Sequence, residues 1–165
     1  MKTRNKTLFL AQAALIAAAY TVLCVAFAPI SYGEIQVRIA EALVILPFFT
    51  PAAVPGLFVG CLLSNILGGS VLLDVIGGSI ATLIGAIGSW CLRKHKGLIL
   101  IPPIAANVAI VPFVLRYGYG VNLPIPFMMV TVGIGEIIAV GVLGSILLRA
   151  LEKSGDVIFR KSWSV

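Results

Sequence analysis

Long apolar stretches, broken by short polar or glycine- and proline-containing connections, are the feature that most limits what this chain can fold into. Hydrophobic residues make up 60% of the 165 residues, only 11% are charged, and the mean hydropathy is +1.11. A soluble domain typically has about 25% charged and about 45–50% apolar residues. Because a small soluble core cannot bury this much apolar surface, we expect a lipid bilayer to surround a single integral membrane domain over residues 1–165.

Six apolar segments have the composition and boundaries expected of membrane helices. A transmembrane helix needs about 20 residues, and proline or glycine marks several of the ends. The predicted segments are residues 8–28, 39–50, 53–67, 72–92, 97–115 and 123–151. The second and third are short for full spans, so we expect them to be tilted or to meet a thinned or protein-lined region. The first is longer than the apolar core of a signal peptide, which indicates a retained span.

The basic residues predict the orientation of the chain in the membrane. Most of them lie in three clusters: Lys2 to Lys6, Arg93 to Lys96, and Arg149 to Lys161. Cytoplasmic loops are enriched in Lys and Arg. With six spans and the N-terminus inside, all three clusters fall on one side and only Arg38 and Arg116 remain outside. We therefore predict an all-α membrane protein with six transmembrane helices and both termini in the cytoplasm. A nucleic-acid partner is not expected, because no single basic face with interleaved aromatics is present.

Sequence signatures of enzymes and of metal or cofactor sites are not found. The chain has no P-loop, GxSxG or HExxH motif. Its cysteines, Cys24, Cys61 and Cys91, are odd in number and scattered, without zinc-ligand spacing. We therefore expect a protein that performs no catalysis and has no metal or cofactor. An energised transporter of this kind would need an ATPase from a partner.

Acidic side chains within the apolar segments are the first candidates for binding a solute. Glu136 lies deep in the sixth segment, where a carboxylate is costly and commonly faces a polar cavity or a partner. Glu41 lies at the start of the short second segment, where the helix dipole also stabilises its negative charge. Asp74 begins the fourth segment, where it can either bind solute or cap that helix.

Further polar side chains extend this candidate set, each with a structural alternative. Asn107 lies in the middle of the fifth segment and Asn65 near the end of the third, and such amides either bind ligand or bond to neighbouring helices. Glu34 and Arg38 can bind solute or pair with each other at i, i+4, and Glu136 can pair with Arg38. A mostly acidic and amide set suits a neutral or cationic solute rich in N–H donors.

Small residues dominate the first segment. Ala13 with Ala17, and Ala14 with Ala18, have the small-xxx-small spacing that lets another helix approach closely. The approaching helix can belong to the chain's own bundle or to a partner protein.

The stretch GEIQVRIAEALVILPFFTPAAVPGLFVGCLLSN, Gly33 to Asn65, resembles the QueT family. This family comprises substrate-binding S components of energy-coupling factor (ECF) transporters, assigned to queuosine precursors. The six-span layout, the basic leader and the alanine-rich first segment are similar too, so the resemblance covers nearly the whole chain. It implies an ECF S-component-like bundle in a bacterial cell membrane. The S component binds solute from outside, and an ECF transmembrane coupling subunit with two cytoplasmic ATPase subunits drives uptake.

The resemblance also implies roles for particular residues. In such S components an AxxxA-type face on the first helix docks the coupling subunit, and the four alanines of the first segment match that pattern. Queuosine precursors such as preQ1 and queuine are 7-deazaguanines, whose N1–H and N2–H₂ donors one carboxylate can accept together. The aminomethyl group of preQ1 is cationic and would want a second carboxylate. Glu41, Glu136 and Asn107 fit this demand. Candidates for stacking on the base are the aromatic residues Tyr32, Phe113 and Tyr117.

Two other functions are compatible with the same sequence. An S component for another small vitamin or nucleobase would have the same fold and a different ligand. A small channel or a structural membrane protein would need neither a tight ligand nor an ATPase partner.

Overall fold

The described part of the chain is built from helices and their connecting turns. The computed structural model describes residues 2–27 and 38–158, with side chains for residues 6–27 and 38–153. Within these ranges there is no strand, which confirms the all-helical class. The elements are α1 (Lys2–Ala26), η1 (Ile39–Phe48), α3 (Ala53–Leu67), α4 (Leu72–Cys91), η2 (Leu98–Leu100), α5 (Ile101–Gly118), α6 (Ile125–Glu136), η3 (Ile137–Leu143) and α7 (Gly144–Ile158). Four residues covered by the sequence analysis lie outside the described residues: the candidate site residues Tyr32 and Glu34, and the basic residues Arg160 and Lys161.

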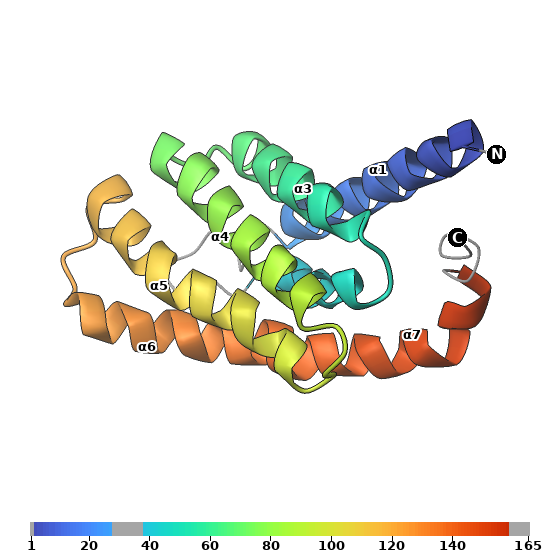
Figure 1. The fold of residues 1–165 in the computed structure, drawn as a ribbon. Helices are drawn as coiled ribbons and strands as arrows, with labels where there is room; N and C mark the ends of the chain where they lie inside the picture. The colour runs from blue at the N-terminus through green and yellow to red at the C-terminus, as the bar shows by residue number, and fades with distance from the viewer. Residues whose placement is uncertain (1, 28–37, 159–165) are drawn as a thin grey trace.

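The helices run side by side in a bundle (Figure 1). Two helix pairs, α1 with α3 and α4 with α5, make the most extensive contacts, and α6, η3 and α7 follow one another as a single long rod. The start of α1, the turn after α4 and the end of α7 lie toward the same end, on the right of Figure 1. An ion pair between Lys96 and Glu152 joins that turn to α7. The basic turn and α7 therefore meet at one end of the bundle, and the prediction that this end faces the cytoplasm is untested.

Four described helices are long and apolar enough to cross a membrane. They are Lys6–Ala26, Leu72–Cys91, Leu98–Gly118 and Ile125–Lys153. The helices η1, with 10 residues, and α3, with 15 residues, are apolar but shorter. Large apolar side chains such as Leu15 and Leu72 are exposed on the outside of the bundle, as lipid contact requires. The chain is therefore a multi-pass membrane protein, and crossing by all six segments remains a prediction.

The alanine-rich helix α1 presents two different faces. On one face, a Cβ atom added to Gly56 would lie 2.7 Å from the Ala13 carbonyl oxygen, and one added to Gly60 would lie 2.9 Å from that of Ala17. Because glycine has no side chain, the backbones of α1 and α3 can approach this closely. Ala13 and Ala17 thus pack within the chain's own bundle. On the other face, Ala14 and Ala18 are exposed.

Two helices of unusual geometry lie against each other in the bundle. The ten residues of η1 form a 3₁₀-helix that includes Pro47, and η3 is a π-helix of 7 residues that begins directly after Glu136. These two elements contact each other. Runs of 3₁₀-helix longer than about four residues are uncommon, and π-helical turns occur frequently at functional sites. Glu41 and Glu136 therefore lie in, or directly beside, the two least regular helices.

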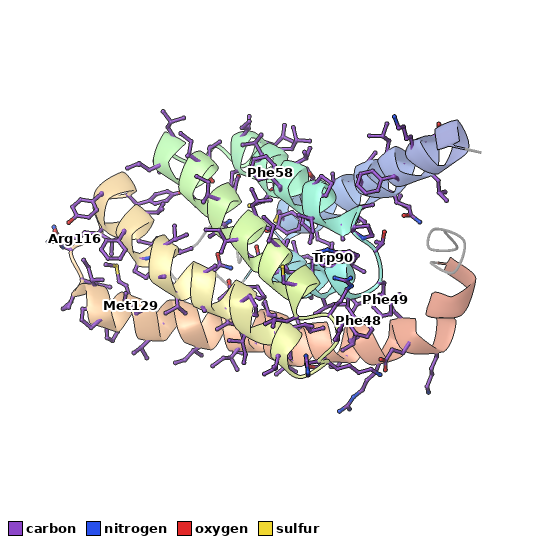
Figure 2. The ribbon with its side chains drawn as sticks, in the orientation of Figure 1. Phe48, Phe49, Phe58, Trp90, Arg116 and Met129 are labelled. Carbon is purple, nitrogen blue, oxygen red and sulfur yellow. The ribbon has the colours of Figure 1, made fainter. Side chains whose placement is uncertain are left out.

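Apolar side chains form the core toward one end of the bundle. Tyr20, Ile45, Leu57 and Ile99 are fully buried there. Figure 2 shows Phe48, Phe49 and Trp90 toward the right of the bundle, and Arg116 and Met129 toward the left. A smaller apolar cluster joins α5 and α6. Both clusters fix the helix positions around the polar residues described next.

Candidate functional site

A buried polar cluster lies between the helices. Its central side chains come from six different elements and are almost completely buried: Tyr20 of α1, Glu41 of η1, Cys61 of α3, Thr82 of α4, Asn107 of α5 and Glu136 of α6. Polar groups inside a membrane protein are costly unless they are bonded to one another or to a ligand. The structure thus brings together three of the residues predicted to bind solute, Glu41, Asn107 and Glu136.

Glu41 is held through one of its two carboxylate oxygens. Its Oε1 accepts a hydrogen bond from the Tyr20 hydroxyl and another, of 3.3 Å, from the Thr82 hydroxyl. Its Oε2 is buried and has no hydrogen-bond partner among the described residues. The carboxylate is therefore fixed in position and keeps one acceptor oxygen available.

Glu136 of α6 belongs to the same buried polar cluster as Glu41. The Asn107 amide lies beside both carboxylates, and the two are close enough for their negative charges to repel. The Glu136 Oε2 atom is buried and, in the part of the chain that the structure describes, accepts no hydrogen bond. Glu136, Asn107 and Arg38 line a cavity together with Val111 and Val132.

The cavity is small in this structure. Its volume of about 10 Å³ has room for about one water molecule. A solute the size of a nucleobase therefore needs side chains or helices to move before it can reach the two carboxylates.

An ion pair between Arg38 and Asp74 borders the cluster. Arg38 Nη2 donates to both carboxylate oxygens of Asp74, at 3.1 and 3.0 Å, and the Tyr119 hydroxyl donates to Asp74 Oδ2 at 2.8 Å. The Asn65 amide donates to the Asp74 backbone oxygen at 3.1 Å. Desolvation in this surrounding raises the pKa of the Tyr119 hydroxyl. Asp74 is fully buried, so the pair is shielded from water.

Two structural alternatives from the sequence are corrected here. Asp74 does not cap α4, because the cap position is Val71 and no side chain bonds there. Within the described ranges the ion pair of Arg38 is formed with Asp74 and not with Glu136. Arg38 and Asp74 are 36 residues apart in the sequence. The i, i+4 spacing of a helix identifies pairs within one helix and gives no information on a pair this far apart in the chain.

Cys61 connects the two halves of the cluster. Its sulfur accepts hydrogen bonds from Thr82 Oγ1 at 3.4 Å, from Asn65 Nδ2 at 3.7 Å and from Arg38 Nη1 at 3.8 Å. Sequence reasoning found no ligand spacing for this thiol and did not include Tyr20, Thr82 or Tyr119 among the candidates. The available signal was weak: Cys61 and Asn65 are spaced i, i+4 and share one face of α3.

The aromatic candidates Phe113 and Tyr117 lie elsewhere. Both are exposed and line an apolar groove of about 380 Å³ between α4 and α5, together with Leu73, Ile76 and Ile110. The structure does not bring them to the carboxylates.

The cluster offers acceptor groups to hydrogen-bond donors. Two carboxylates and an amide offer acceptor oxygens that an N–H-rich or cationic solute can use. No three His, Cys, Asp or Glu side chains within residues 2–27 and 38–158 are grouped to hold a metal ion. The arrangement therefore favours recognition of a polar organic solute.

Comparison with known proteins identifies the family of the chain. Residues 10–153 match the family described as QueT transporter. No curated protein and no solved structure matches the chain. The matched range runs from α1 into α7 and includes every residue of the polar cluster. Membership of a transport family implies that the protein moves a solute across the membrane. The chain belongs to the QueT transporter family, as its resemblance to that family predicted.

Proposed function

We propose that this chain is the substrate-binding S component of an ECF-type importer. It captures a 7-deazaguanine precursor of queuosine, such as preQ1 or queuine, from outside a bacterial cell for ATP-driven uptake. The observation that carries the proposal is the pair of buried carboxylates, Glu41 and Glu136, each with an acceptor oxygen that has no partner among the described residues. The family match to a transporter supports it.

The chemistry of the base fits the cluster. The N1–H and N2–H₂ groups of a guanine-type edge are adjacent donors, which one carboxylate can accept together. Glu41 is suited to this role, because Tyr20 and Thr82 hold its Oε1 and orient the group. Asn107 can both donate to and accept from the rest of the base.

The position of the Arg38–Asp74 pair supports entry from the outer side. In the predicted topology, Arg38, Asp74 and Tyr119 lie at the outer ends of their helices, and Arg38 also lines the cavity beside Glu136. Solute arriving from outside passes this pair before it reaches the carboxylates. Because the cavity holds about one water molecule, binding and opening are coupled.

The exposed face of α1 supports docking of a partner. Ala14 and Ala18 are exposed and small, so a helix of the ECF transmembrane coupling subunit can approach the α1 backbone closely there. The sequence contains no P-loop, and two cytoplasmic ATPase subunits supply the energy in this proposal.

The identity of the ligand can be tested by mass spectrometry of the purified protein. The protein is purified in detergent from bacteria that are supplied with queuosine precursors, and the small molecules released on denaturation are identified. The expected result is a 7-deazaguanine. A different vitamin or nucleobase in its place would contradict the assigned substrate. No ligand, together with no binding of added 7-deazaguanines, would favour a channel or a structural protein.

A further inference from the structure

The buried charges around the cavity do not balance. Arg38 and Asp74 compensate each other in their ion pair. Glu41 and Glu136 then remain as two buried carboxylates within reach of each other's charge. Among the described residues, the other titratable groups that face them are the Tyr20 hydroxyl on α1 and the thiols of Cys24 and Cys61, and these groups are neutral in their usual state. Two like charges in a low-dielectric interior repel strongly, so both carboxylates cannot be ionised together without a compensating cation.

The surroundings of the two carboxylates differ. Glu41 accepts hydrogen bonds from the hydroxyl groups of Tyr20 and Thr82 and lies in the first turn of η1. Both features favour its ionised form. Glu136 lies at the junction of α6 and η3, away from a free helix start. Each carboxylate has a buried Oε2 without a hydrogen-bond partner in the described part of the chain, and the charge of Arg38 acts on both. The ionised form of Glu136 is therefore the less supported of the two.

We propose that Glu136 exchanges its proton for the positive charge of the ligand. The inference rests on the proposed function and specifies its substrate as a cationic 7-aminomethyl-7-deazaguanine. When the ammonium group of the ligand reaches Glu136, the O–H bond of the Glu136 carboxyl group breaks and its proton passes to the solvent. The resulting carboxylate then accepts an N–H hydrogen bond from the ammonium group. One positive charge leaves the site and one arrives, so the net buried charge is unchanged.

The exchange gives the site a means of discriminating between ligands. A primary ammonium group keeps its proton near neutral pH, since an alkylamine such as that of lysine has a pKa of about 10.4. A 7-cyano-7-deazaguanine has the same ring and nearly the same size, but its side group is neutral. It offers nothing to compensate an ionised Glu136, so it binds without proton release and without the charged hydrogen bond. We expect the cationic ligand to bind about 10- to 100-fold more tightly.

Titration calorimetry on the detergent-purified protein tests this directly. Both 7-deazaguanines are titrated near neutral pH in phosphate and in Tris, whose enthalpies of ionisation differ. The change in binding enthalpy between the two buffers gives the number of protons released. The expected result is about one proton for the aminomethyl ligand and none for the cyano ligand.

A matched pair of variants assigns the proton to its residue. Glu136→Gln has the shape of the protonated acid and cannot ionise, so it should abolish proton release and reduce the amine-to-nitrile affinity ratio toward one. Glu152→Gln removes a carboxylate from the distant Lys96 pair and should preserve both the release and the ratio.

The outcomes that oppose the proposal are distinct. Equal affinity for both ligands without proton release, or release that persists in Glu136→Gln, would overturn the exchange and leave the proposed function intact. Failure of both ligands to bind the wild-type protein would overturn the proposed function and the exchange with it.

Discussion

The two faces of α1 allow a sharp test of how this chain meets its partner. Ala13 and Ala17 contact α3, whereas Ala14 and Ala18 are exposed on the other face. Replacing an alanine with leucine on each face adds the same atoms to the same helix. The two replacements should therefore impair different properties. Leucine on the face that contacts α3 should impair folding and ligand binding, and leucine on the exposed face should impair assembly.

The structure sets the size of each effect. The Ala17 Cα atom lies 3.1 Å from the position that a Cβ on Gly60 would occupy, so Ala17→Leu has no space for its added carbons. Overpacking of this kind costs about 1–3 kcal/mol, and it displaces α3, which carries Cys61. Ala18→Leu is exposed and should change the free energy of unfolding by no more than about 0.5 kcal/mol. If a partner helix packs there, the same overpacking should weaken assembly by about 5- to 150-fold.

The assay measures three quantities for each variant: unfolding temperature, affinity for a 7-deazaguanine in detergent, and co-purification with the ECF transmembrane coupling subunit. Ala18→Leu and Ala14→Leu should lose only co-purification, and Ala17→Leu should lose stability and ligand affinity. The docking hypothesis fails if Ala18→Leu assembles normally. It also fails if Ala18→Leu loses ligand binding together with assembly, because that result would place the face inside the bundle.

Two further predictions concern the ion pairs and the energy source. Asp74→Asn should lower the free energy of unfolding by about 3–5 kcal/mol, because it removes a buried partner of the Arg38 charge. Glu152→Gln, which removes the exposed ion pair with Lys96, should lower it by less than about 1 kcal/mol. Equal losses of stability in thermal unfolding would contradict the argument from burial. Vesicles that contain only this chain should bind a 7-deazaguanine without accumulating it, and accumulation should require the coupling subunit, the ATPases and ATP; accumulation without them would show that the chain transports alone.

Helix content was predictable from the sequence, because apolar runs of this length can satisfy their backbone groups in a membrane only as helices. The type of helix, α, 3₁₀ or π, was not predictable from the sequence. The 3₁₀ form of η1 and the π-helix η3 arise where the two elements pack against each other, and a single apolar run carries no information about such a contact.

The candidate site was partly predictable for a related reason. Glu41 and Glu136 are conspicuous because a carboxylate in an apolar segment is costly. The structure places both in one buried polar cluster with Asn107, and a role for them in binding solute remains a prediction. Phe113 and Tyr117 show the limit of reasoning from residue type alone. Phe113 follows Asn107 by six residues, or about 240° around the helix axis at 3.6 residues per turn, so the two side chains lie on different faces of α5. Counting that angle would have separated them.

The affinity of purified wild-type protein for a 7-deazaguanine, compared with Glu41→Gln and Glu136→Gln, tests the central claim most directly. Each substitution keeps the shape of the side chain and removes its charge. The loss of a charged hydrogen bond should cost about 1.5–3 kcal/mol, or about 10- to 150-fold in the dissociation constant, while the unfolding temperature stays near that of the wild type. Unchanged affinity in both variants would show that the buried carboxylates do not bind the solute, and the site assignment would be wrong.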